Sequence, residues 1–330
     1  MDFLDHNLFQ KQISSWKVKK LIRLIGNYKM KNNLKSLKTD KLNISYFEIG
    51  NENSIPVFLM HGFPYDIYAY KDVVEILKKH DLRIIVPYLR GFGHTSFLNK
   101  SFLRSGEQAA LGKDLIDLMD GLNIKKAILA GYDWGGRAAC VVAALYPHRC
   151  IGLISCNGYN IQNIKIDSIT PDKPENEKNY WYQYFFHTKR GFNSLTKNRN
   201  DIIKFLWKTW SPTWKFSKKD FELSQESFQN PDFVDVVIHS YKHRYGLVDG
   251  DKSYSNIENK LSLTPKIKVP TITIDGLMNG VREPKHKKNI KRFTNLIKHK
   301  LLKNVGHNVP QESPLIFSNL ILEIKKYANH

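Results

Sequence analysis

The chain of 330 residues is 42% hydrophobic and 12% aromatic, which excludes a disordered protein and predicts a large buried core. Its formal net charge is +20, but the lysines are scattered and no RNP-like, helix-turn-helix or zinc-finger motif accompanies them, so we expect no nucleic-acid partner. No apolar run is long enough to span a bilayer.

Residues 1–40 form a basic amino-terminal extension. Apolar side chains such as Ile13, Trp16, Leu21 and Leu24 recur at helical spacing among lysines, which predicts an amphipathic helix. It is either a membrane-surface or targeting segment, or an additional helix packed on the core. We favour the packed helix because lysines interrupt any signal-like apolar run.

From residue 41 onward, predicted strands alternate with predicted helices. The expected strands are 42–49, 55–60, 83–87, 126–130, 150–156, 270–275 and 300–303, and the expected helices are 66–80, 106–122, 138–145, 284–293 and 312–327. This alternation predicts an α/β fold with a doubly wound, mostly parallel sheet. In such a sheet, ligands bind beyond the carboxyl ends of the strands.

The segment His61-Gly62-Phe63-Pro64 directly follows the second predicted strand. The backbone N–H of Phe63 would face the same crevice as the N–H of Trp134, and the two would form an oxyanion hole. We also place His61 among the substrate-binding residues. The glycine-rich turn over residues 88–96 is interpreted as a structural loop that supports this side of the crevice.

The sequence of residues 130–137, Ala-Gly-Tyr-Asp-Trp-Gly-Gly-Arg, joins an apolar strand to a helix of small residues. Gly131 and Gly135 flank Asp133, as expected for a sharp bend that presents a nucleophile. A carboxylate that attacks a saturated carbon forms an ester, which water then hydrolyses. The bend therefore predicts an alkyl-enzyme intermediate; the alternative is that Asp133 caps the helix of a nucleotide-binding loop.

Residues 158–262 interrupt the strand-helix alternation. They contain few strand-like runs and many aromatic residues, among them Tyr182 and Tyr184, and we place Tyr184 among the substrate-binding residues. We predict a mainly helical cap inserted between two parts of the core, residues 41–157 and 263–330. Most of these aromatic residues would form the core of the cap, while others would keep water away from the nucleophile.

A histidine follows the last predicted strand, in the segment Val305-Gly306-His307-Asn308. At this place it suits a general base that activates water for hydrolysis of the ester. The alternative is an ordinary surface histidine. The cysteines Cys140, Cys150 and Cys156 lie in apolar runs without CxxC spacing, which indicates buried thiols in the cytoplasm and no metal site.

Together, the segment 61–64, the turn Arg90-Gly91-Phe92-Gly93, the Asp133 bend, the aromatic insertion and Gly306-His307 resemble the α/β-hydrolase superfamily over residues 41–330. Within it, the chain is most similar to the epoxide hydrolase and haloalkane dehalogenase branch. The order of nucleophile, acid and histidine in that superfamily agrees with this sequence.

The resemblance implies roles for two tyrosines of the cap. Tyr182 and Tyr241 match the phenols that bind the epoxide oxygen and donate a proton as the ring opens. The implied substrate is a small apolar electrophile, and no cofactor is expected.

Dehalogenation is the alternative activity. Trp134 could supply an N–H to a halide, but Phe63 stands where many haloalkane dehalogenases have asparagine. Arg137 matches one of two arginines that hold the substrate carboxylate in fluoroacetate dehalogenases, whereas Trp134 replaces the other. We therefore keep Arg137 among the substrate-binding residues and expect no carboxylate substrate.

The acid partner of His307 departs from the family pattern. Asn157 and Asn279 stand at the two positions where the family has a carboxylate, and Asp275 lies at a strand end nearby. Three interpretations remain open. Asn279 could orient His307 without contributing a charge, Asp275 could reach His307 through a shifted loop, or the enzyme is slow or inactive. Replacing the Asp of a triad by Asn lowers the rate by about 10⁴.

Three classes of protein thus remain after the sequence analysis. The first is an epoxide hydrolase or related enzyme with reduced or unusual activity, which we favour because nucleophile, base and phenols persist. The second is a binding protein on a degenerate hydrolase scaffold. The third is a membrane-associated protein recruited by the basic amino-terminal extension.

Overall fold

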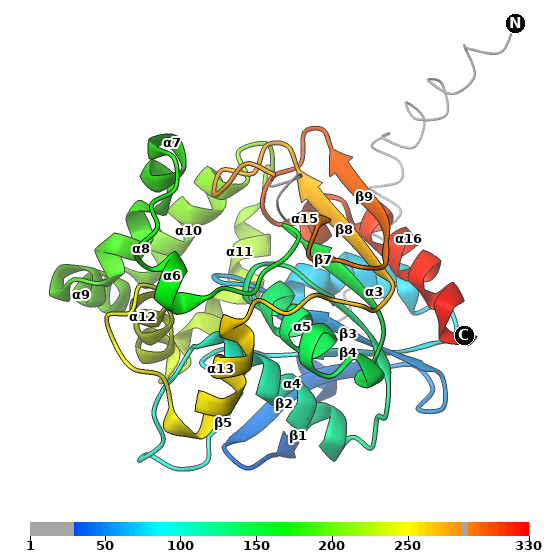
Figure 1. Ribbon diagram of the computed structural model, residues 1–330. Helices are drawn as coiled ribbons and strands as arrows, with labels where there is room; N and C mark the ends of the chain where they lie inside the picture. Colours follow the sequence, from blue (N-terminus) through cyan, green and yellow to red (C-terminus); the bar gives the residue numbers. More distant parts are fainter. Residues whose placement is uncertain (1–29, 285–289, 330) are drawn as a thin grey trace, which may run out of the picture. The chain divides into compact units, whose positions relative to one another are not determined.

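A computed structural model describes residues 30–284 and 290–329 of the chain (Figure 1). The chain divides into two compact units, residues 1–33 and residues 34–330. In the first unit, the described residues form a short 3-10 helix, Met30–Asn33. The amphipathic helix predicted from the amino-terminal sequence lies outside the described residues.

Nine strands of the described residues form one sheet, in the order β1-β2-β4-β3-β6-β7-β8-β9, with β5 paired to β2. Their bounds are β1 Leu34–Lys38, β2 Leu42–Ile49, β3 Ile55–Met60, β4 Leu82–Pro87, β5 Ser96–Phe97, β6 Ala127–Gly131, β7 Cys150–Cys156, β8 Thr271–Gly276 and β9 Leu296–Leu302. The pairings from β4 through β3 to β9 are parallel, and β2 pairs antiparallel with its three neighbours.

The central strands are continuous apolar runs because both faces of the sheet are covered. Every residue of β6 and β7 is buried, as expected for parallel strands between two layers of helices. Helices α4 (Gln108–Gly121) and α5 (Asp133–Leu145) pack against each other, and α3 (Lys71–Leu77) packs against α16 (Pro314–Lys325). Figure 1 shows these two pairs on opposite faces of the sheet.

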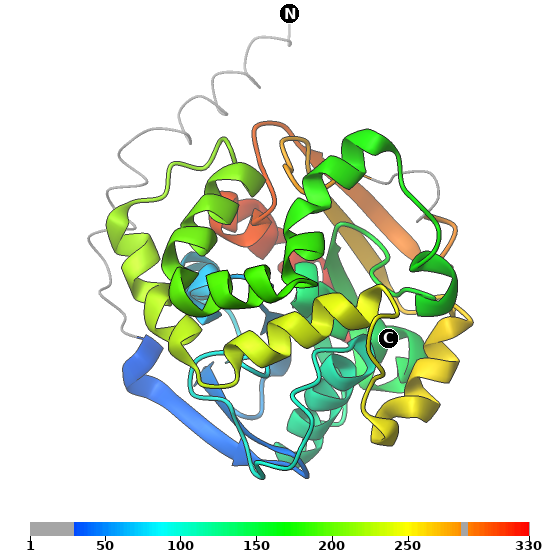
Figure 2. The ribbon, with the colours of Figure 1, turned by 90° about the vertical axis from the view of Figure 1, so that its left-hand side faces the viewer.

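Residues 158–262, which we call the cap, lie between β7 and β8 and contain only helices among their regular elements. The helices are α6 Ile164–Asp167, α7 Pro174–Glu177, η4 Lys178–Tyr180, α8 Trp181–Phe186, α9 Lys189–Lys197, α10 Arg199–Trp210, α11 Lys218–Gln225, η5 Glu226–Gln229, α12 Phe233–Arg244, η6 Lys252–Tyr254 and α13 Ser255–Ser262. Figure 2 shows the cap helices side by side in front of the sheet.

The predicted fold class is confirmed: the chain is an α/β protein with a doubly wound, mostly parallel sheet and an inserted, mainly helical cap. The predicted boundary of the core at residue 41 is wrong, because β1 already pairs with β2 from Leu34 onward. The sequence obscured β1 because this outer strand contains two lysines and no buried residue. The last strand also begins earlier than predicted, at Leu296 rather than at Lys300.

Other predictions concern single segments. The helix predicted over residues 284–293 falls largely on residues 285–289, which lie outside the described residues. The three cysteines are free and buried, as predicted. In the part of the chain that the structure describes, no helix is both long enough and apolar enough to cross a membrane.

The glycine-rich turn over residues 88–96 is anchored by a buried ion pair. Arg90 is 0% exposed, and its Nε and Nη2 donate to the carboxylate of Asp114 at 2.7 and 2.6 Å. Nη1 donates to the carbonyl and hydroxyl oxygens of Ser105, and Nη2 also reaches the hydroxyl of Tyr254 on η6. This arginine therefore ties the turn to α4 and to the end of the cap, which agrees with the structural role expected for the turn.

The variant Arg90→Met should lower the free energy of unfolding by about 3–5 kcal/mol, because it leaves the Asp114 carboxylate without its cation. Urea unfolding followed by tryptophan fluorescence measures the change. The control is Lys298→Met, which removes the exposed ion pair with Glu323 and should change stability by less than about 1 kcal/mol. Equal effects of the two variants would contradict the assignment.

Candidate active site

The bend after β6 holds Asp133 in a strained backbone conformation. Its φ of 51° lies in the left-handed region, which non-glycine residues rarely adopt. A Cβ atom on Gly131 would lie 2.6 Å from the carbonyl carbon of Gly135, and one on Gly135 would lie 2.1 Å from the Met60 oxygen. Both flanking positions therefore require glycine, and α5 begins at the presented carboxylate itself.

Two backbone N–H groups converge on one oxygen of this carboxylate. Oδ1 of Asp133 accepts from the N–H of Phe63 at 2.8 Å and from the N–H of Trp134 at 2.7 Å. Burial raises the pKa of Asp133, but His307, the positive charge of Arg244 and the Phe63 N–H together lower it below its usual value. The carboxylate is therefore ionised at neutral pH, and 14% of its side chain is exposed.

His307 faces the other oxygen of the carboxylate. Its Nε2 lies 3.5 Å from Oδ2 of Asp133, and its Nδ1 lies 3.3 Å from Oδ1 of Asn279. The backbone N–H of His307 donates to the Trp210 carbonyl and to the Ser211 hydroxyl, at 3.1 and 3.0 Å. The end of α10 in the cap therefore positions the imidazole of the core.

Of the three candidates for the acid position, Asn279 is the one that contacts His307. Asp275 instead lies 3.8 Å from Nε2 of His299, so the interpretation in which a shifted loop brings it to His307 is wrong. Burial raises the pKa of Asp275 to about 6. Asn157 is held at a φ of 63°, and its buried side-chain oxygen has no hydrogen-bond partner among the described residues.

The two predicted phenols lie together above this group. Tyr182 on α8 and Tyr241 on α12 are buried, and their ring centroids are 5.4 Å apart. The Tyr182 hydroxyl accepts from Nε2 of Gln183, while the Tyr241 hydroxyl has no hydrogen-bond partner in the described part of the chain. Burial raises the pKa of both phenols, so both are protonated at neutral pH.

Two of the predicted substrate-binding residues have other contacts. His61 bridges two loops, since its ring nitrogens face the Gly62 carbonyl and the Leu89 N–H, each at 3.1 Å, and burial lowers its pKa to about 4. Tyr184 is 38% exposed and its hydroxyl donates to Glu177. The substrate-binding roles of His61 and Tyr184 stay predictions.

The structure adds one residue that the sequence analysis missed. Arg244, the last residue of α12, places its guanidinium carbon 4.9 Å from the ring centroid of Tyr241 and 5.8 Å from that of Trp134. Its distance of three residues from Tyr241 puts both on one face of the helix, and this spacing could have identified it. Arg137, which was predicted, lies one helical turn after Asp133 on α5.

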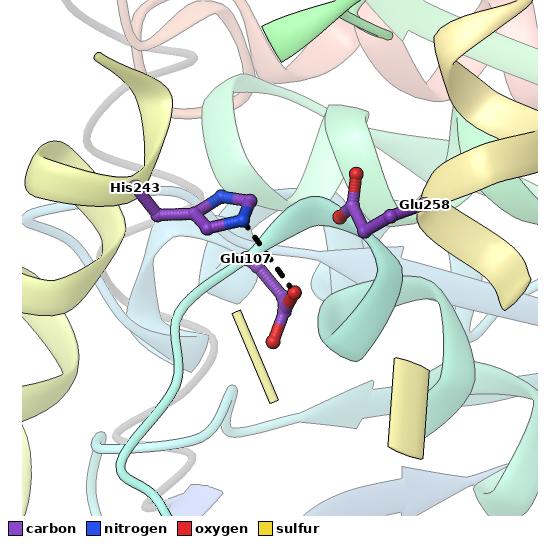
Figure 3. Close-up of side chains that lie close together, drawn as sticks. All are labelled: Glu107, His243 and Glu258. Atoms are coloured by element: carbon purple, nitrogen blue, oxygen red, sulfur yellow. Dashed lines mark ion pairs between the residues drawn. The ribbon is translucent and has the colours of Figure 1, made fainter. Parts of the chain in front are cut away.

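One group of side chains among the described residues has the composition of a metal site. Figure 3 shows Glu107 and His243 pointing toward each other, with Glu258 of α13 beside them, and their ligand atoms lie within 4.8 Å of one another. Glu107 already accepts from the Asp251 N–H, and Glu258 accepts from two donors of α4. We therefore assign these side chains to the contact of α4 with α12 and α13.

The comparisons with known proteins agree with this arrangement. Residues 55–314 match the family described as alpha/beta hydrolase fold. The chain belongs to this family of enzymes.

Its relatives define the branch. Epoxide hydrolase 4 of Homo sapiens is 25% identical and covers 86% of this chain and 76% of its own length. AB hydrolase superfamily protein YfhM of Bacillus subtilis is 25% identical and covers 88% of this chain and 96% of its own length. The crystal structure of a "putative epoxide hydrolase" from Klebsiella pneumoniae is 40% identical, with a TM-score of 0.89 and coverage of 91% and 100%. The chain is thus a hydrolase of the epoxide hydrolase branch.

The variant Asp275→Asn tests the corrected position of that carboxylate. Because the pKa of Asp275 is about 6 in the folded protein and 3.8 ordinarily, the wild type loses stability as the pH rises through this range. The variant lacks this loss, so it should be more stable than the wild type by up to about 3 kcal/mol above pH 6 and similar to it below about pH 4.

Urea unfolding at several pH values measures this difference. Turnover by the variant should stay within roughly two-fold of the wild type, since Asp275 does not contact His307. A much larger loss of turnover would indicate that Asp275 is the acid partner of His307 after all.

Proposed function

We propose that this hydrolase opens epoxides through a covalent ester on Asp133. The observation that carries the proposal is the orientation of one carboxylate: Oδ1 is held by two backbone N–H groups, and Oδ2 is directed toward His307. The epoxide hydrolase names of the relatives support the substrate class.

In the first step, Oδ2 of Asp133 attacks a ring carbon of the epoxide. The new C–O bond forms as the ring C–O bond breaks, and the ring oxygen takes a proton from Tyr182 or Tyr241. Both phenols are neutral acids at pH 7, and the one that donates becomes a tyrosinate. The two N–H groups on Oδ1 keep the carboxylate oriented during the attack.

In the second step, Nε2 of His307 takes a proton from a water molecule, whose oxygen attacks the carboxyl carbon of the ester. The negative charge of the tetrahedral intermediate develops on Oδ1, where the N–H groups of Phe63 and Trp134 form the oxyanion hole. The ester C–O bond to the diol then breaks, and the diol oxygen takes the proton from the His307 imidazolium. The carboxylic acid left on Asp133 loses its proton, and the tyrosinate formed in the first step is protonated again. Asn279 accepts a hydrogen bond from Nδ1–H and keeps Nε2 free for the water.

Dehalogenation is the second candidate function. The indole Nε1 of Trp134 is buried without a hydrogen-bond partner among the described residues, as a halide donor would be. The paired phenols beside it favour an oxygen leaving group that needs a proton. The mechanism would otherwise share the same nucleophile and base.

The variant His307→Gln should accumulate the ester intermediate, because attack by Asp133 is spared while activation of water is lost. Intact-mass analysis after incubation with styrene oxide should show one adduct, which peptide mapping places on Asp133. The control variant Asp133→Asn should form none.

Parallel incubations with 1-chlorobutane, followed by chloride assays, separate the two candidate functions. An adduct with the epoxide alone supports epoxide hydrolysis, and one with the haloalkane alone supports dehalogenation. Absence of any adduct across both would instead favour a binding role for the scaffold.

The variant Asn279→Asp should raise the rate of ester hydrolysis, because a carboxylate stabilises the imidazolium that an amide cannot. The corresponding change in a serine-protease triad alters the rate by about 10⁴, and we expect a gain of at least about ten-fold here. Single-turnover kinetics should show faster loss of the adduct with little change in its formation. The matched variant Asn279→Ala should slow the same step, and a gain in that variant would contradict the role of the amide.

A further inference from the structure

Arg244 brings a positive charge to the aromatic side of the site. Its guanidinium lies over the rings of Tyr241 and Trp134, and Trp134 donates its backbone N–H to the nucleophile. In the described part of the chain, this guanidinium has no hydrogen bond and no ion pair. The two rings offer cation–π contacts but no counter-charge.

A second guanidinium, that of Arg137, lies one helical turn after the nucleophile on α5. Nη1 of Arg137 donates to the side-chain oxygens of Gln108 and Gln162, at 3.3 and 2.8 Å, and its buried Nε has no partner among the described residues. Both acceptors are neutral amides, so they orient the guanidinium without cancelling its charge. Burial and the like charge of Arg244 lower the pKa of Arg137 to about 9, which indicates that the two cations lie near each other.

The positive charge of Arg244 is therefore not matched by an ion pair among the described residues, whereas the carboxylate of Glu258 acts on Arg137. Asp133 is the anion of the catalytic group, and its charge is already shared with two backbone N–H groups. Asn279 contributes no charge at the acid position. Arg244 is half-buried and has no ion pair among the described residues, and a carboxylate on a ligand would supply one.

We propose that the substrate of this hydrolase is an epoxide that carries a carboxylate near the ring, and that Arg244, supported by Arg137, binds this carboxylate. The planar fork of a guanidinium matches a carboxylate with two parallel hydrogen bonds. This inference rests on the proposed epoxide hydrolysis for its reaction. The sequence analysis expected no carboxylate substrate, because Trp134 stands where a second arginine would be. The structure places Arg244 of α12 beside Trp134, and this arginine leads to the opposite inference.

The experiment compares matched epoxides that differ in one charge. The probes are 2,3-epoxypropanoate, 3,4-epoxybutanoate and 4,5-epoxypentanoate, each paired with its primary amide. We expect kcat/KM for one carboxylate to exceed that for its amide by about ten-fold or more, as a charge-assisted hydrogen bond provides. Arg244→Gln should remove this preference by lowering kcat/KM for the carboxylate about ten-fold more than for its amide.

The control is Lys242→Gln, which removes the same charge two residues away on α12 and should keep the preference. Equal kcat/KM for carboxylates and amides in the wild type would overturn the proposal. So would an equal loss for both in Arg244→Gln, because Arg244 would then act on the phenols or the fold instead of on the substrate carboxylate.

Binding of an unreactive analogue separates this inference from the proposed reaction. Cyclopropanecarboxylate has the shape of 2,3-epoxypropanoate but cannot be opened, and calorimetry compares its binding with that of cyclopropanecarboxamide. One outcome is that the wild type binds cyclopropanecarboxylate selectively, Arg244→Gln loses this binding, and no epoxide is turned over. This outcome would support the anion site and overturn the epoxide chemistry. Turnover of the epoxide amides without selective binding of cyclopropanecarboxylate would support the epoxide chemistry and overturn the anion site.

Discussion

Two backbone N–H groups on one carboxylate oxygen are the constraint on which the site depends. They come from loops after β3 and β6, which are parallel neighbours with Met60 opposite Gly131. Because both strands end at the same edge of the sheet, the N–H of Phe63 and that of Trp134 meet at Oδ1 of Asp133. The carboxylate is thereby oriented before any ligand arrives, which reduces the reorganisation needed in the reaction.

The cap takes part in this arrangement as more than a cover. The carbonyl of Trp210 and the hydroxyl of Ser211 hold the backbone of His307 in the core. Helices α8 and α12 contribute the phenols, and α12 also carries Arg244. Asp133 and His307, the proposed nucleophile and base, thus belong to the core, whereas the position of His307 and the two phenols depend on the cap.

The electrostatic balance of the site differs from that of a charged catalytic triad. Nδ1 of His307 faces the amide oxygen of Asn279, so in the proposed mechanism an imidazolium would have no carboxylate at Nδ1. His307 and the positive charge of Arg244 keep the pKa of Asp133 below its usual value. An ionised nucleophile, neutral phenols and cations without ion pairs favour a substrate that is itself polar at one end.

The sequence by itself determined the fold class, the helical cap, the bend at Asp133 and the candidates His307, Tyr182 and Tyr241. These follow from local patterns: apolar runs, glycines that allow a sharp turn, and the order of motifs along the chain. Only the tertiary structure decided which acidic or amide group meets His307 and that Arg244 joins the site. Those answers depend on contacts between residues far apart in sequence and on side-chain direction, which no local pattern specifies.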